Sequence, residues 1–92
     1  MENQHRKITG YRELTQTEID LMNQVKALGV QIEDVLLQVD NHIRSQRGVS
    51  KPVAETNRMN NATPERFLAL AKTELQTGLM YATRAVAQPE LF

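Results

Sequence analysis

Two sets of side chains in this 92-residue sequence could bind an anion. Lys26 lies in a predicted helix and has no carboxylate three or four residues away on either side. Its ammonium is therefore either available to a phosphate or an ordinary solvated lysine. Arg66 and Thr73 are seven residues apart and share one face of a second predicted helix, with Lys72 adjoining. Repeated around an oligomer axis, such cations and hydroxyls would form a ring of phosphate donors, although polar helix faces commonly have this composition.

Tyr11 is a candidate for stacking on a nucleobase. It lies beside Gly10 and between the cations Lys7 and Arg12, outside the apolar stripes of the predicted helices. A tyrosine stacked on a base contributes about 1–3 kcal/mol to binding. The alternative, which spacing alone favours, is that Tyr11 packs on the helices as a lid.

Catalytic and metal-binding patterns are missing from the sequence. His5 and His42 are the only histidines, there is no cysteine, and no Glu-x-x-His pair or glycine-rich phosphate loop occurs. The neighbouring carboxylates Glu33 and Asp34 diverge by about 100° on a helix, so they form no acid–base pair and more simply belong to a solvated face. We therefore expect neither an enzyme nor a metal or other cofactor.

The composition restricts the partners and the location of the protein. Eleven Lys plus Arg balance eleven Asp plus Glu, and this zero net charge argues against binding long DNA or RNA or an anionic membrane by bulk attraction. The apolar runs are far shorter than the roughly 20 residues of a membrane span, and the polar N-terminus does not resemble a signal peptide. These features are typical of a small soluble intracellular protein.

The elements that would carry these residues are two long helices in one domain spanning residues 1–92. Thr15 and Glu18 have capping-box spacing at the start of a predicted helix over 15–46. Residues 47–63 lack a period and are predicted to form a polar loop. Thr63 as N-cap and Pro64 then begin a helix over 64–88, which ends before Pro89. The prediction is an all-α antiparallel hairpin preceded by an N-terminal segment, 1–14.

The hairpin has more apolar surface than two helices can cover. A stripe runs along the first helix at near-heptad spacing, and a second row beside it, with two residues of the other helix, would face water: Met22, Leu36, Ile43, Phe67 and Met80. This surface predicts a homo-oligomer. A three-helix monomer closed by residues 1–14 is the alternative. Gly78 among small residues also predicts a close helix–helix approach.

Three blocks of the sequence resemble the phage-encoded anti-CBASS cyclic-nucleotide sponges. The blocks cover most of the chain outside 47–63 and read Ile8-x-Gly10-Tyr11-Arg12-x-Leu14, then Glu18-Ile19-Asp20-Leu21-Met22-Asn23-x-Val25-Lys26, then Glu65-Arg66-Phe67-Leu68-Ala69 continuing through Lys72-Thr73-Glu74-Leu75-Gln76-Thr77-Gly78-Leu79-Met80 to Thr83-Arg84-Ala85-Val86-Ala87-Gln88-Pro89. The resemblance implies an all-helical homohexamer with a short N-terminal helix and two long antiparallel helices. It also implies sequestration, without cleavage, of cyclic oligonucleotide messengers in the cytoplasm of the bacterial host.

The resemblance further implies two kinds of ligand pocket. Tyr11 and Lys26 match the aromatic residue and the lysine that hold cyclic dinucleotides between protomers. Arg66 matches the arginine of a separate cyclic trinucleotide pocket on the threefold axis, and its partner is Thr73 or, in another register, Lys72. A cyclic dinucleotide has two charges and two base faces, so a Tyr–Lys pair from each of two chains would match it by symmetry. The competing hypothesis is a helical adaptor that binds a host protein through its apolar face.

Overall fold

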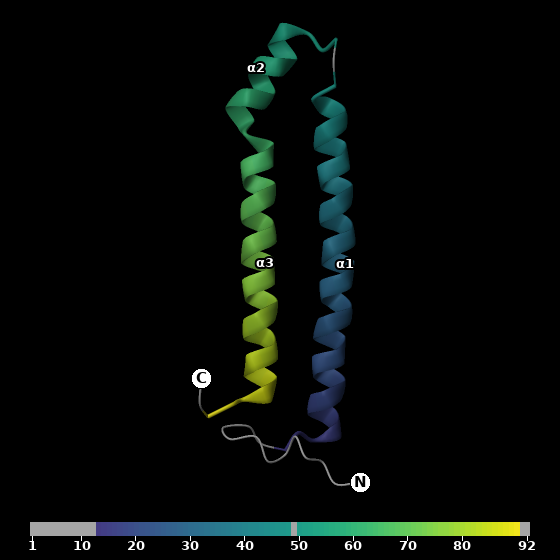
Figure 1. Cartoon of the computed structure of the whole chain (residues 1–92), viewed down its shortest axis with the longest axis vertical. Coiled ribbons are helices and arrows are strands. Elements are labelled where there is room, and N and C mark those ends of the chain that lie inside the picture. Colours follow the sequence, from purple (N-terminus) through teal and green to yellow (C-terminus); the bar gives the residue numbers. More distant parts are fainter. Residues whose placement is uncertain (1–12, 49, 91–92) are drawn as a thin grey trace.

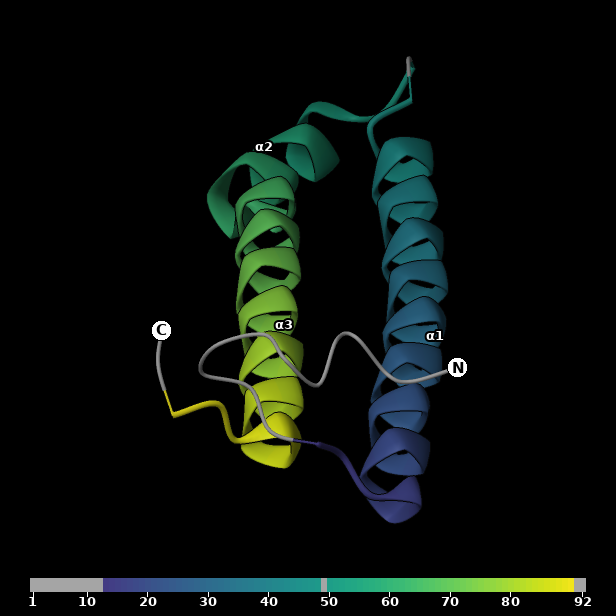
Figure 2. The ribbon, with the colours of Figure 1, turned by 60° about the horizontal axis from the view of Figure 1, so that its bottom comes forward.

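The protein is an antiparallel helical hairpin with a bent tip. The computed structural model describes residues 13–48 and 50–90, in which three helices occur and no strand: α1 (Gln16–Gln46), α2 (Val53–Ala62) and α3 (Pro64–Ala87). Figures 1 and 2 show α1 and α3 lying side by side along their whole length, with α2 across the far end. The molecule is elongated, with extents of 64 × 22 × 18 Å. The all-α hairpin prediction is confirmed for these residues, whereas the predicted N-terminal helix lies largely outside them.

The start of α1 is a reciprocal capping box, as the sequence predicts. The Thr15 hydroxyl accepts a hydrogen bond from the Glu18 amide at 3.2 Å, and the Glu18 carboxylate accepts one from the Thr15 amide at 2.7 Å. Both amides would otherwise lack a partner at the helix start. The cap therefore fixes where α1 begins and hence the position of Lys26 along it.

The predicted loop over 47–63 is wrong in its central part, because Val53–Ala62 forms α2. The helix follows Pro52, and the Arg58 guanidinium forms a bidentate ion pair with Glu55 on its surface. Met59 is buried against the tip of the hairpin. The segment has few apolar residues and hence no visible period, since it buries a single side chain rather than a stripe.

α2 passes directly into α3 through Thr63, whose φ of 46° is in the left-handed region. Thr63 is the N-cap residue of α3, as expected, and Pro64 occupies the first turn. The expected capping bond is missing, however, because the Thr63 hydroxyl donates to the Ala62 carbonyl at 2.8 Å instead. At the other end α3 stops at Ala87, next to Gln88 and Pro89, where the sequence predicts it to stop.

The seam between α1 and α3 combines Val25 and Ile32 of the predicted near-heptad stripe, both half-buried, with the second row that the sequence predicts to face water. Residues predicted to face water lie in the seam, where Ile43 is buried and Met22 and Leu36 are half-buried. The exposed row is instead part of the near-heptad stripe: Leu21, Leu28, Val35 and Val39. One helix covers only a stripe of roughly 100° on its neighbour, so α3 hides one row and leaves the next exposed. Phe67 and Met80 are exposed, as predicted.

The close approach of the two long helices occurs at Gly29 rather than at Gly78. A Cβ atom at Gly29 would lie 3.2 Å from the Leu79 Cδ1 atom, so α1 and α3 approach each other closely there. A Cβ at Gly78 would meet nothing within 4 Å among the described residues. The close approach predicted at Gly78 is therefore not made by the described part of this chain.

Candidate functional site

Lys26 lies at the edge of a shallow concavity of about 380 Å³ between α1 and α3. Its walls are mainly apolar, and it is lined by Met22, Asn23, Val25, Lys26 and Gly29 of α1 and by Leu79, Met80 and Thr83 of α3. No ion pair between described residues involves Lys26, which is exposed. An ammonium group beside an apolar surface suits a ligand with both an anionic group and a flat apolar face. The ammonium would bind the anion, and the apolar surface would contact the flat face.

Thr83 brings a polar group of α3 to the same concavity. Its hydroxyl donates to the Leu79 carbonyl at 3.0 Å, which leaves the oxygen lone pairs as acceptors. Tyr11, the predicted partner of Lys26, lies outside the described residues. The structure therefore brings Lys26 together with Thr83, which the sequence analysis did not single out. Lys26 and Thr83 are 57 residues apart in the sequence, so no local sequence pattern indicates that they lie near each other.

Neither Arg66 nor Thr73 lines this concavity. Seven residues make almost two helical turns, so the two positions differ by only about 20° around the axis. Both side chains are exposed. The Arg66 guanidinium carbon lies 5.5 Å from the centroid of the Phe67 ring, in a cation–π contact. Arg66 and Thr73 therefore share a face, as the spacing predicts.

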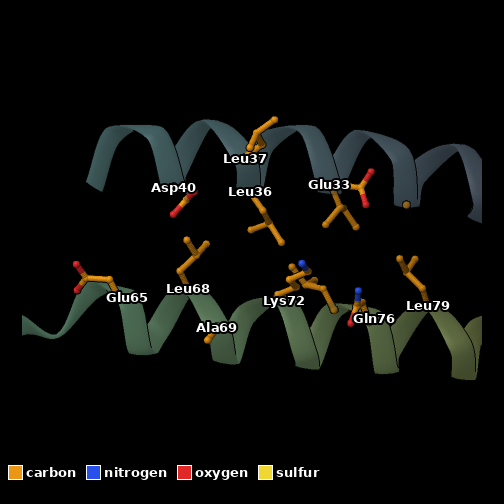
Figure 3. A pocket seen from close by; sticks show the side chains of 13 residues that line it. Glu33, Leu36, Leu37, Asp40, Glu65, Leu68, Ala69, Lys72, Gln76 and Leu79 are labelled. Carbon is orange, nitrogen blue, oxygen red and sulfur yellow. The ribbon is translucent and has the colours of Figure 1, made fainter. Parts of the chain in front are cut away.

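Lys72 lies on a different surface, in a long groove between α1 and α3. Figure 3 shows its side chain between the two helices, with Glu33 and Asp40 on α1 and Glu65 on α3. Because the Lys72 side chain lies in this groove, it does not belong to the exposed face that carries Arg66 and Thr73. The structure thus brings together Arg66 and Thr73 and separates Lys72 from both.

The groove around Lys72 has about 650 Å³ of space and an acidic lining. Its apolar walls come from leucines and an isoleucine of both helices, Ile32, Leu36, Leu37, Leu68, Leu75 and Leu79. Three carboxylates, Glu33, Asp40 and Glu65, face one ammonium. Two of these carboxylates are ion-paired with arginines, Asp40 with Arg44 and Glu65 with Arg47, which leaves Glu33 beside Lys72 as the carboxylate that is in no ion pair among the described residues.

Arg47 closes the tip of the hairpin. Its guanidinium donates to both carboxylate oxygens of Glu65, at 2.7 and 2.9 Å, to the Asn60 side-chain oxygen at 2.7 Å and to the Met59 carbonyl at 3.4 Å. The hydrogen bond from Arg47 lowers the pKa of Glu65, and the same bond raises the pKa of Arg47. The Glu65 carboxylate is therefore ionised and hydrogen-bonded to Arg47, although Arg66 is its neighbour in the sequence.

The described residues contain no group of three or more His, Cys, Asp or Glu side chains placed to hold a metal ion. No helix in this part of the chain is long and apolar enough to cross a membrane.

The chain is a small all-helical hairpin over the residues that the structure describes, with Lys26 and Arg66 both exposed. A family model described as "Acb2/Tad1, hairpin domain" matches residues 3–87, and the chain belongs to this family. It is similar to a protein of Pseudomonas phage JBD67 named "Anti-CBASS protein 2", with 42% identity over 106 aligned positions that cover 98% of each chain. The family resemblance stated from the sequence is thereby confirmed.

Proposed function

We propose that this chain is a phage immune-evasion protein that binds and sequesters the cyclic di- and trinucleotide messengers of bacterial anti-phage signalling inside the infected cell. Membership of the hairpin family and the name of the phage relative support the anti-CBASS role. The observation that carries the ligand class is Lys26, an unpaired ammonium at a mainly apolar concavity built by both helices. Sequestration requires only affinity and abundance, so the proposal assigns no catalytic group.

The dinucleotide site combines Lys26 with Tyr11. A cyclic dinucleotide has two phosphodiester charges and two flat bases. Two copies of the chain would supply two ammonium groups and two aromatic rings, so each half of the ligand would meet one Lys26 and one Tyr11. Charge-assisted hydrogen bonds to phosphate and stacking on the bases then contribute together.

The trinucleotide site combines Arg66 with Thr73 on the outer face of α3. A guanidinium and a hydroxyl on one exposed face can both donate to a phosphate. Three copies around an axis would present three such pairs to a ligand with three phosphates. Lys72 is left out of this site, since it lies in the acidic groove.

Both sites require a homo-oligomer, which we propose is a hexamer. The chain exposes 7528 Å², whereas a compact monomer of its mass exposes about 5,400 Å². The exposed row Leu21, Leu28, Val35 and Val39 recurs at intervals of seven, seven and four residues, the spacing by which helices pack in coiled coils. A neighbouring chain packed on this row would cover these four exposed apolar side chains of α1.

The assembly is tested by charge substitution on that row. Leu28→Glu would place a carboxylate in the chain–chain contact, and we expect light scattering to show a smaller particle than wild type. Asn41→Glu introduces the same side chain on an exposed face of α1 outside the row and is expected to leave the mass unchanged. Equal masses for all three proteins would contradict the proposed contact.

The function itself is tested by ligand recovery. The protein is mixed with a cyclic dinucleotide, freed of excess ligand and digested with protease, and the released nucleotide is identified by chromatography. Recovery of intact ligand is expected. Altered ligand would indicate an enzyme, and absence of retained ligand would favour the adaptor that binds a host protein through the exposed row.

The dinucleotide site is tested by Lys26→Ala, with Lys51→Ala as the control at another exposed lysine. We expect calorimetry to show loss of dinucleotide binding only in the Lys26 variant, with the particle mass unchanged. Wild-type affinity in Lys26→Ala would contradict this site.

A further inference from the structure

We infer that Phe67 is a base-stacking residue of the Arg66 site, so that one side-chain pair binds both the phosphate and the base of a cyclic trinucleotide. This inference rests on the proposed function, because it concerns the ligand proposed for Arg66. Phe67 was considered in the sequence analysis only as exposed apolar surface.

The geometry of the pair is the first argument. Phe67 is 57% exposed, and α3 places it away from the seam with α1. The guanidinium carbon of Arg66 lies 5.5 Å from the ring centroid. The ring is thus accessible to solvent and lies beside a cation. Aromatic and guanidinium planes are the two surfaces on which unstacked nucleobases pack in proteins.

The charge around Arg66 is the second argument. The residues three and four positions away along the helix are Ala62, Thr63, Ala69 and Leu70, so no carboxylate can pair with Arg66 along α3. The nearest carboxylate in sequence, Glu65, accepts hydrogen bonds from two nitrogens of the Arg47 guanidinium, Nε at 2.7 Å and Nη2 at 2.9 Å. Arg66 consequently keeps its positive charge for a ligand, while the charge of Glu65 is offset.

The chemistry of the ligand is the third argument. A cyclic nucleotide carries a phosphate and a base a few ångströms apart, and a site that bound only the phosphates would recognise their number and spacing but make no contact with the bases. An aromatic ring adjoining the phosphate donor supplies the missing contact with the base. By analogy with alanine substitutions at other stacking residues, removal of the ring should weaken binding about tenfold to a hundredfold.

The test uses two substitutions at Phe67 and one control. Phe67→Leu keeps an apolar side chain and removes the ring, and we expect a cyclic trinucleotide to bind about tenfold to a hundredfold more weakly by calorimetry. Tyr81→Leu makes the same kind of change at another exposed aromatic residue of α3, 65% exposed, and is expected to bind as wild type. Dinucleotide binding should be unchanged in both variants.

The second variant provides a direct signal from the ring. The chain has no tryptophan, so Phe67→Trp introduces a single emitter at this position. We expect the cyclic trinucleotide to quench its emission through stacking, and a cyclic dinucleotide to leave it unchanged. Light scattering on each variant reports whether the assembly is intact.

Three results would overturn the inference, and they are distinguishable. Wild-type protein that binds no cyclic nucleotide refutes the proposed function and the inference with it. Wild-type protein that binds the trinucleotide, with Phe67→Leu binding equally well and Phe67→Trp emission unchanged, refutes the inference alone. A smaller particle in Phe67→Leu shows that the ring is a chain–chain contact rather than a ligand contact.

Discussion

Arg47 and Glu65 form a bidentate ion pair that joins the end of α1 to the first turn of α3, with N–O distances of 2.7 and 2.9 Å. The same guanidinium also donates to Asn60 and to the Met59 carbonyl of α2. One side chain therefore holds all three helices at the tip, around the two buried apolar residues, Ile43 and Met59. The planar guanidinium suits this role because it offers five N–H donors in fixed directions.

Arg47→Ala should lower the melting temperature more than Arg44→Ala. Arg44 is a fair control because it pairs only within α1, with Asp40 at 2.9 Å, and its side chain is largely exposed. Loss of Arg47 leaves acceptors of α2 and α3 without their donor, whereas loss of Arg44 removes a local surface pair. Differential scanning calorimetry of the two variants makes the comparison, and equal melting temperatures would contradict the role of Arg47 at the tip.

The Arg47–Glu65 pair also predicts a pH dependence. The hydrogen bond from Arg47 lowers the pKa of Glu65 in the folded protein relative to the unfolded chain. A carboxylate with a depressed folded-state pKa stabilises the fold at neutral pH, and this stabilisation is lost as the pH falls below about 4.3 through the folded-state pKa. The melting temperatures of wild type and Glu65→Gln should therefore converge on acidification. A constant difference between them would show that the charge of Glu65 does not matter.

Met59→Ala should destabilise the protein by about 2–5 kcal/mol, because it removes a fully packed side chain and leaves a cavity. Met59 is 2% exposed. Met80→Ala is the matched control, since Met80 is 66% exposed in the chain and its loss should change stability by less than about 0.5 kcal/mol. Urea unfolding followed by circular dichroism measures both. Similar midpoints would mean that α2 does not pack on the hairpin through Met59.

Gly78→Ala should stabilise α3 by about 1 kcal/mol, the usual gain from glycine to alanine inside a helix. Nothing within 4 Å opposes a Cβ atom at this position in the described part of the chain. Gly29→Ala should gain less, because its Cβ atom would lie 3.2 Å from Leu79 Cδ1 and that side chain must shift. Thermal unfolding of both variants checks the order. A loss of particle mass in Gly78→Ala would contradict the prediction and indicate a second chain against the glycine.

Local sequence determined most of the long helices. The capping box at Thr15 and Glu18, and the stops at Gln88 and Pro89, depend on residues within four positions of each other, so they are visible in the sequence. The shared face of Arg66 and Thr73 follows equally from helical geometry. The absence of cysteine and of Glu-x-x-His pairs from the sequence favours binding over catalysis.

Tertiary structure decided which surfaces these helices present. Both rows of α1 are apolar, so periodicity could not tell that Leu36 faces α3 while Leu28 and Val35 face outward. The choice depends on the one stripe that a single partner helix can cover. Arg47 and Glu65 are 18 residues apart in the sequence, so their ion pair forms only when α1 and α3 lie side by side. Helix α2 likewise depends on the hairpin, because its buried residue Met59 packs at the tip. The sequence by itself therefore determined the two long helices and the candidate ligand-binding residues on them, whereas the packing of α3 on α1 decided α2 and which residues of different helices share a surface.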